Sequence, residues 1–221
     1  MKKAIIFDSS TLINFSMNGL LNVLEKLKVI FRGKFLITED VKYEVIKRPL
    51  KIKKYQLGAL RIKNLLEKGI LELPEKNSTI EKRTEELLRI ANRTFIARNR
   101  YIHLIDKGEA SCIALSELLT KGKVKNIIAT DERTTRMLCE KPENLRKLLE
   151  TKLHTKIKIK NENLDIFLKF RFIRSCELVY LAYKNNLIDL KNHNVLDALL
   201  YAVKYKGCSV SKEEIETIKK L

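Results

Sequence analysis

Residues 4–15 read AIIFDSSTLINF. The four apolar residues at 4–7 are typical of a short strand buried inside a parallel sheet, and they run directly into the carboxylate of Asp8. Hydroxyl residues follow, which are favoured at the start of a helix. Residues 126–130 (NIIAT) repeat this design and run into Asp131. Short apolar strands that alternate with helices predict an α/β fold, with a central parallel sheet between two layers of helices.

The remaining sequence predicts how this core is extended. The 221 residues show no internal repeat or linker, so we expect one domain over residues 1–221, with helical insertions near 75–105 and 140–170. Residues 75–100 carry apolar side chains at helical spacing and predict a long exposed helix or a helix pair. Residues 156–160 (KIKIK) alternate, as an edge strand does.

Three further elements are expected from local patterns. Residues 12–27 predict one helix, and residues 29–30 and 70–73 are strand candidates because they are short apolar runs next to glycine or proline.

The charge balance indicates an anionic partner. Lys and Arg total 45 against 27 Asp and Glu, a formal net charge of +18, which attracts phosphate backbones. The alternative is a lysine-rich proteome, such as that of a heat-loving organism. We expect RNA contacts from Arg93, Arg98 and Arg100, and the alternative for these side chains is a solvated helix face.

Other features exclude several classes of protein. The four cysteines form no CxxC pair and the three histidines no HExxH motif, so a zinc site is not expected. The widely spaced cysteines predict buried thiols in a reducing compartment. No apolar run approaches the roughly 18–20 residues of a membrane span, and the first residues do not read as a signal peptide. We therefore expect a cytoplasmic protein with no membrane partner.

Four acids are predicted to meet at one edge of the sheet. Asp8 and Asp131 follow buried strands, and ligands of open parallel sheets bind at the carboxyl ends of the strands. Glu44 and Glu109 lie on helices that begin at this edge. Clustered carboxylates repel one another, and Mg²⁺ or Mn²⁺ relieves that repulsion because both ions prefer oxygen ligands. Taken singly, each aspartate has the alternative role of a helix N-cap.

Neighbouring side chains are candidates to assist the four acids. Asp106 and Glu132 are possible auxiliary acids, and the hydroxyls of Ser9 and Thr130 could orient a ligand or water. An acidic pocket in a basic protein suits a nuclease, since a metal ion can activate water for phosphodiester cleavage.

Four segments resemble the motifs of the PIN domain nucleases, a family that includes the toxin ribonucleases of toxin–antitoxin pairs. IIFDSSTLINF resembles the opening strand with its acid, and TEDVKYEVIKRP the segment with the second acid. DKGEASCIALS resembles the third motif and IIATDERTTRML the fourth. The resemblance implies that Asp8, Glu44, Glu109 and Asp131 bind Mg²⁺ or Mn²⁺ and catalyse the cleavage of RNA. It also implies a homodimer and, for a toxin, an antitoxin protein as partner.

The sequence departs from the family pattern in three ways. The chain is longer than a typical toxin, Glu132 stands where an Asp is often found, and RSC replaces a TGT-like element, leaving Ser175 as its hydroxyl residue. A non-catalytic relative that binds RNA or a partner is therefore the alternative function. A phosphatase of the haloacid-dehalogenase type would need an Asp at Ser10, and a Rossmann nucleotide binder would need a glycine-rich turn after the first strand.

Overall fold

A four-stranded sheet forms the centre of the computed structural model, which describes residues 2–75 and 77–221. Lys76, inside the first predicted insertion, lies outside the described residues. All strands run parallel in the order β2-β1-β5-β7. Their bounds are β1 (Lys3–Phe7), β2 (Lys34–Leu36), β5 (Lys125–Ala129) and β7 (Phe172–Ile173). The prediction of an α/β fold with a parallel sheet is confirmed.

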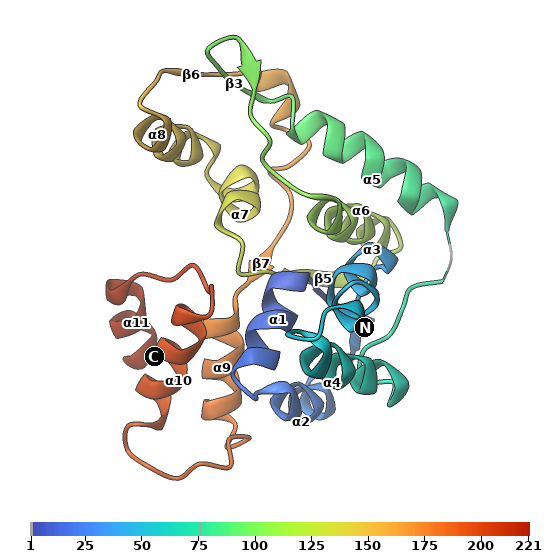
Figure 1. Ribbon diagram of the computed structural model, residues 1–221, viewed down its shortest axis with the longest axis vertical. Helices are drawn as coiled ribbons and strands as arrows, with labels where there is room; N and C mark the ends of the chain where they lie inside the picture. Colours follow the sequence, from blue (N-terminus) through green and yellow to red (C-terminus); the bar gives the residue numbers. More distant parts are fainter. Residues whose placement is uncertain (1, 76) are drawn as a thin grey trace.

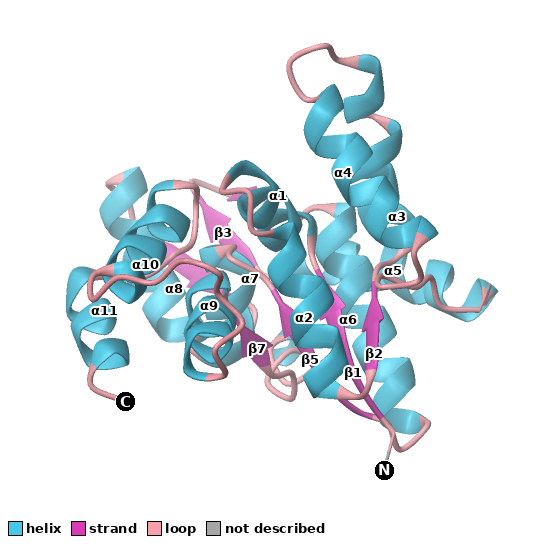
Figure 2. Cartoon of the chain, turned by 90° about the horizontal axis from the view of Figure 1, so that it is seen from below, coloured by secondary structure: helices cyan, strands magenta, loops and turns pink. Residues whose placement is uncertain are grey.

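Helices cover both faces of this sheet (Figures 1 and 2). One face carries α5 (Ser78–Ala91) and α6 (Lys107–Lys121), and the other carries α1 (Ser9–Met17), α2 (Leu21–Phe31) and α9 (Ser175–Lys184). The apolar run of β1 is explained by its place, because this strand pairs on both sides and both of its faces are covered. Ile6 and Phe7 are accordingly fully buried.

The other helices extend these layers. After β2 the chain forms α3 (Glu39–Lys42), a π-helical segment (Tyr43–Lys47), a 3₁₀ turn (Pro49–Lys51) and α4 (Gln56–Glu67). After β5 it forms α7 (Arg133–Glu140) and α8 (Pro142–Leu153), and the last helices are α10 (Val195–Tyr205) and α11 (Lys212–Lys219). Figure 1 shows α10 beside α9, with α11 at the outer side. In the described part of the chain, no helix is both long and apolar enough to cross a bilayer.

A second, three-stranded antiparallel sheet lies apart from the first, in the order β4-β3-β6. Its strands are β3 (Phe95–Ala97), β4 (Arg100–Tyr101) and β6 (Ile157–Ile159), with a 3₁₀ turn (Asn161–Asn163) after β6. Arg98 and Asn99 join β3 to β4 with φ angles of 46° and 62°. Two positive φ angles are typical of the two-residue turn that fits the twist of a hairpin. The edge strand predicted at 156–160 is confirmed, since β6 pairs with β3 alone.

The predicted helix over residues 75–100 is wrong in its second half. The helix α5 ends at Ala91, and Asn92 follows as its C-cap. The side-chain oxygen of Asn92 accepts hydrogen bonds from the backbone N–H groups of Leu104 (2.6 Å) and Ile105 (3.1 Å). These bonds return the chain beside the end of α5. The Thr-Phe-Ile run at 94–96 also favours a strand over a helix.

Three smaller expectations also failed. The helix predicted over 12–27 is divided into α1 and α2 at Gly19, whose φ of +70° suits a residue without a Cβ. Residues 29–30 belong to α2 and not to a strand. Residues 70–73 contribute only an isolated parallel bridge between Leu36 and Glu72.

Candidate active site at the carboxyl edge of the parallel sheet

Asp8 lies between the end of β1 and the start of α1. It is the N-cap of this helix, the alternative role that the sequence left open, because its Oδ2 accepts from the backbone N–H of Ser10 at 3.3 Å. Its backbone N–H donates to the carbonyl oxygen of Ala129 at 2.9 Å, which extends the pairing of β1 with β5 by one residue. The side chain is 2% exposed, and its Oδ2 accepts from the hydroxyls of Ser10 (2.6 Å) and Thr130 (2.9 Å). Its Oδ1 is buried and has no hydrogen-bond partner. A buried, unpaired carboxylate oxygen is costly, and it marks a place where a cation could bind.

Glu109 is held at the first turn of α6 by a capping box. Its Oε2 accepts from the backbone N–H of Asp106 at 2.7 Å, and its Oε1 accepts from the hydroxyl of Thr135. Burial raises the pKa of Glu109 to about 8, and the negative charge of Asp8 adds to the increase. Glu109 therefore holds a proton near neutral pH unless a positive charge approaches it.

Glu44 reaches the same place from a π-helical segment, a rare conformation that is frequent at functional sites. Burial raises the pKa of Glu44, with further contributions from the charges of Asp8 and Asp106. A Cβ built on Gly108 would lie only 2.6 Å from Oε2 of Glu44 and 2.7 Å from Oε1. The glycine therefore allows the carboxylate of Glu44 to lie directly over the first turn of α6.

The three acids form one electrostatic group. The charge of Asp8 raises the pKa of both Glu44 and Glu109, so both glutamates lie within reach of its field. They do not form a finished coordination shell, because within residues 2–75 and 77–221 no three His, Cys, Asp or Glu side chains gather closely enough to hold a metal ion.

Asp131 lies after β5, next to Asp8, but its surroundings differ. It is 3% exposed, and Oδ2 accepts from Asn14 Nδ2 (2.8 Å) and Ser175 Oγ (2.6 Å). Oδ1 accepts from the backbone N–H of Ser175 at 2.8 Å. Both carboxylate oxygens are thus bound by donors from α1 and α9. The structure places Asp131 beside the group as a residue fully engaged by the protein.

The predicted auxiliary residues have separate environments. Thr130 donates to Asp8, and its hydroxyl oxygen accepts from the backbone N–H of Glu132 at 3.1 Å. A hydrogen bond from Ser9 lowers the pKa of Glu44 against the effect of burial. Asp106 is exposed at the N-cap of α6 and lies 2.8 Å from Nε2 of His103. Glu132 is exposed at the N-cap of α7, and its charge adds to that around Glu109.

The sequence analysis missed three contributors to this site. Ser10 links the two aspartates, because its hydroxyl contacts Oδ2 of Asp8 and accepts from the backbone N–H of Asp131 at 3.0 Å. Asn14 and Thr135 bind acid side chains from the interior of helices. The one local signal for these contributors was Asn14, a polar residue among apolar neighbours in the helix that follows the first acid.

The arginines predicted to contact RNA do not lie on a helix. Arg93 follows α5, Arg98 occupies the hairpin turn, and Arg100 begins β4. All three are exposed, but they surround the second sheet and not the long helix that was expected.

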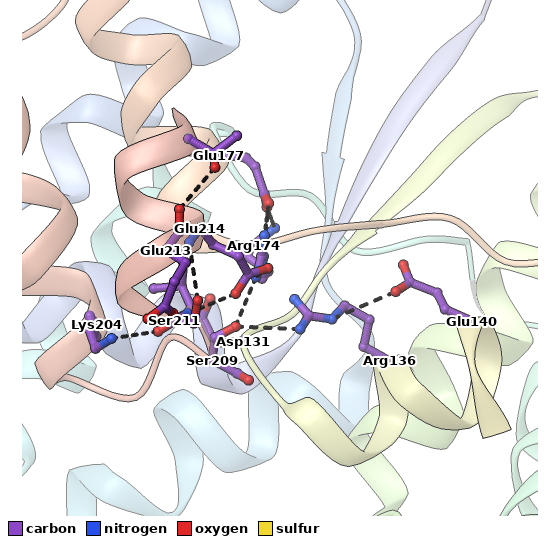
Figure 3. A network of polar contacts seen from close by, with 12 residues as sticks. Asp131, Arg136, Glu140, Arg174, Glu177, Lys204, Ser209, Ser211, Glu213 and Glu214 are labelled. Atoms are coloured by element: carbon purple, nitrogen blue, oxygen red, sulfur yellow. Dashed lines mark hydrogen bonds and ion pairs between the residues drawn. The ribbon is translucent and has the colours of Figure 1, made fainter. Parts of the chain in front are cut away.

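A cavity of about 680 Å³ lies between α7 and α8 on one side and α10 and α11 on the other. Its wall includes most of the residues labelled in Figure 3, among them Arg174, which donates to Glu177 (2.8 Å), to Glu214 (2.8 Å) and to the carbonyl oxygen of Ser209 (3.0 Å). None of the four predicted acids lines this cavity. This cavity is therefore separate from the acid group.

No protein-family model, curated protein or solved structure matches the chain. The resemblance to PIN domain nucleases consequently stays a prediction, and the functional argument depends on the site itself.

The donor atoms are of the kind that a hard divalent cation binds, although among the described residues the three acids are not drawn together into one cluster. Asp8 offers an unpaired buried oxygen, and Glu44 and Glu109 have raised pKa values that a positive charge would lower. Carboxylate oxygens are the ligands that Mg²⁺ and Mn²⁺ prefer.

Proposed function

We propose that the protein is a divalent-metal-dependent ribonuclease that hydrolyses RNA phosphodiester bonds. The observation that carries the proposal is the unpaired Oδ1 of buried Asp8, beside two acids whose pKa values are raised. Asp8, Glu44 and Glu109 are the residues that would hold Mg²⁺ or Mn²⁺. Such an ion supplies an activated water and stabilises charge on the phosphate oxygens.

The protein's own groups fix the orientation of these acids. Ser10 and Thr130 bind Oδ2 of Asp8, so Oδ1 stays free for a ligand. The backbone N–H of Asp106 and the hydroxyl of Thr135 hold the carboxylate of Glu109. Preorganised ligands of this kind avoid the cost of ordering side chains when the substrate binds.

Asp131 has a positioning role in this proposal. Its backbone N–H binds Ser10, which in turn binds Asp8, while its carboxylate binds Asn14 and Ser175. It thereby fixes α1 and α9 at the edge of the sheet. This differs from the role as metal ligand that the family resemblance implies.

RNA is the proposed substrate because the net charge of +18 favours a polyanion and the site offers carboxylates for a metal. The resemblance to PIN domain nucleases supports the same substrate. We also propose that the protein is cytoplasmic. The resemblance further supports a homodimer and, if the protein is a toxin, an antitoxin partner.

Cleavage of a labelled structured RNA by the wild type and by Asp8→Asn tests this proposal. We expect cleavage with Mn²⁺ or Mg²⁺, none with EDTA, and a loss of at least about 100-fold in the variant, since one metal ligand is removed. Asp165→Asn is the matched control, because Asp165 is an exposed aspartate outside the site. A second readout is the thermal midpoint, which Mn²⁺ should raise in the wild type but not in Asp8→Asn.

A non-catalytic RNA-binding protein is the alternative function. RNA binding without cleavage under any metal, together with no Mn²⁺ stabilisation, would favour that alternative. Equal activity of Asp8→Asn and the wild type would remove the acid group from the mechanism.

A further inference from the structure

The three-stranded sheet has one buried and one exposed face. Phe95 and Ile157 are buried, whereas Ile96 is paired with Tyr101 on one side and with Lys158 on the other. Residues that face each other across strands share a side of the sheet, and alternate residues of a strand share it too. Tyr101, Lys156, Lys158 and Lys160 therefore belong to one face, which we call the basic sheet face.

The protein balances the positive charge on this sheet only in part, since Glu150 acts electrostatically on Lys156 and Glu162 acts on Lys160. Residues 93–101 and 156–160 contain six Lys or Arg residues and no Asp or Glu. These six are Arg93, Arg98, Arg100, Lys156, Lys158 and Lys160, of which Arg100 pairs with Ala97 and so belongs to the opposite face from Tyr101. Among the described residues none of them forms an ion pair. A surface of unpaired cations is suited to a polyanion.

An aromatic ring lies among these cations. Tyr101 is 50% exposed, its hydroxyl accepts from Nζ of Lys160 at 2.9 Å, and the same Nζ lies 5.2 Å from the ring centroid. The ring is thus held in place and remains open to solvent. Proteins that bind single-stranded nucleic acid combine such a ring, on which a base stacks, with cations that bind the backbone.

A short connection fixes the basic sheet face near the acid group. Asp106 is the fifth residue after Tyr101, which limits the distance between their Cα atoms to about 18 Å. Asn92 holds this connection, because its side chain accepts from the N–H groups of Leu104 and Ile105 and donates to the carbonyl oxygen of Ile105 at 2.9 Å. The next residues begin α6, which carries Glu109.

We propose that the basic sheet face binds single-stranded RNA next to the acid group, with a base stacked on Tyr101 and the backbone on the surrounding Lys and Arg side chains. This inference rests on the proposed function for its choice of RNA. Protection of an edge strand explains lysines at an edge. It does not explain an exposed tyrosine that is fixed by one of them, and a base-paired duplex or an acidic protein would not use that ring for stacking.

Binding of a fluorescent single-stranded oligoribonucleotide, measured by anisotropy in EDTA, tests this inference separately from cleavage. All proteins carry Asp8→Asn. We expect Tyr101→Ala to weaken binding by about 5- to 100-fold and Tyr101→Phe by less than about 3-fold, since phenylalanine keeps the ring. Replacing Arg98, Lys156 and Lys158 by Ser should lower the slope of log affinity against log salt by about 2.

The chain offers a matched control at a second exposed tyrosine. Tyr55 is also 50% exposed and has Nζ of Lys54 at 5.4 Å from its ring, within a run that contains Lys51 and Lys53. Tyr55→Ala, and a triple change of these lysines to Ser, remove the same ring or the same charge elsewhere. We expect these controls to change binding by less than about 3-fold, because these residues lie outside the basic sheet face. The loss of a base stack would weaken binding by more than this.

If the variants of the basic sheet face and the control variants lose RNA affinity equally, binding depends on total charge alone, and the inference is overturned. So would unchanged binding in Tyr101→Ala, provided that its circular dichroism matches the wild type. If the Tyr101 variant loses binding but the protein with intact Asp8 cuts no RNA under any metal, the sheet binds RNA and the proposed nuclease function fails. If cleavage is metal-dependent but binding does not change in the Tyr101 variant, the nuclease function is supported and the proposed role of the basic sheet face fails.

Discussion

β1 and β5 lie side by side, and each ends in a buried aspartate, yet the two carboxylates have opposite surroundings. Asp131 is bound by three donors, two from Ser175 and one from Asn14. Asp8 has one oxygen bound and one buried oxygen with no partner. The same local pattern, an apolar strand followed by Asp, therefore supplies a structural anchor in one strand and a candidate metal ligand in the next.

The difference comes from what the following helices present. The helix after β1 carries Asn14 toward Asp131, and the helix after β7 presents the N–H and hydroxyl of Ser175 to the same carboxylate. Asp8 receives all its donors, the hydroxyl and backbone N–H of Ser10 and the hydroxyl of Thr130, on Oδ2 alone. Asp131 thus has its charge distributed over protein donors, whereas the charge of Asp8 remains available to a ligand and to its acidic neighbours.

The largest expected effect is on stability at Asp131. Asp131→Ala removes the acceptor of three hydrogen bonds and leaves buried donors of Asn14 and Ser175 unpaired, so we expect a loss of about 3–5 kcal/mol in the free energy of unfolding. Asp8→Asn keeps an oxygen for Ser10 and Thr130 and replaces only an oxygen that already lacks a partner, so its change should stay within about 1 kcal/mol. Urea denaturation in EDTA measures both.

A larger loss in Asp8→Asn than in Asp131→Ala would contradict this division of roles. An added Mn²⁺ series refines the test, since Mn²⁺ should stabilise Asp131→Asn, if it folds, but not Asp8→Asn.

A smaller effect is expected from pH at Glu109. Its pKa is about 8 in the folded protein and near 4.5 when exposed, so between these values the folded state binds more protons than the unfolded state. In EDTA the stability of the wild type should therefore fall as pH rises from about 5 to 8, by up to about 1 kcal/mol per pH unit. Glu109→Gln should flatten this dependence, and a fixed excess of Mn²⁺ should oppose it. Thermal unfolding across this pH range measures the slope.

Glu162→Gln, a change of an exposed glutamate, is the control and should leave the slope unaltered. A slope in Glu109→Gln equal to that of the wild type would show that another group titrates in this range.

The smallest effect on stability is expected at Gly108. In Gly108→Ala the new methyl group occupies the space of the Glu44 carboxylate, which can swing away because it ends a flexible side chain. We expect a stability change within about 1 kcal/mol, because alanine also favours the helix, together with a loss of Mn²⁺ affinity of roughly 10-fold. Mn²⁺ titration monitored by calorimetry checks this. Gly58→Ala, a helical glycine in α4, is the control and should leave Mn²⁺ affinity unchanged.

The parts of the fold that follow from local pattern could be predicted from the sequence. The strands at 4–7 and 126–130 are apolar because both of their faces are covered, and Asp8 and Asp131 follow directly at the sheet edge. The caps by Thr38 and Ser211 also follow from nearby residues. These features need no knowledge of distant partners.

The parts that depend on distant partners could not be predicted. Asn14 and Asp131 are 117 residues apart, so nothing near Asp131 indicates that its carboxylate is already engaged. The helix predicted up to Arg100 failed for a related reason, because β3 is stabilised by pairing with β6, about 60 residues later. The role of Gly108 is likewise visible only once Glu44 lies over it.

The pairing of β3 with β6 makes two distant segments of the chain depend on each other. The stretches near 75–105 and 140–170, both predicted as insertions, supply adjacent strands of one small sheet. A shortened chain that lost only the second stretch would leave β3 and β4 as a two-stranded hairpin, which is marginally stable in water. Neither stretch could be gained or discarded alone without that penalty, so the two are expected to be inherited as a pair.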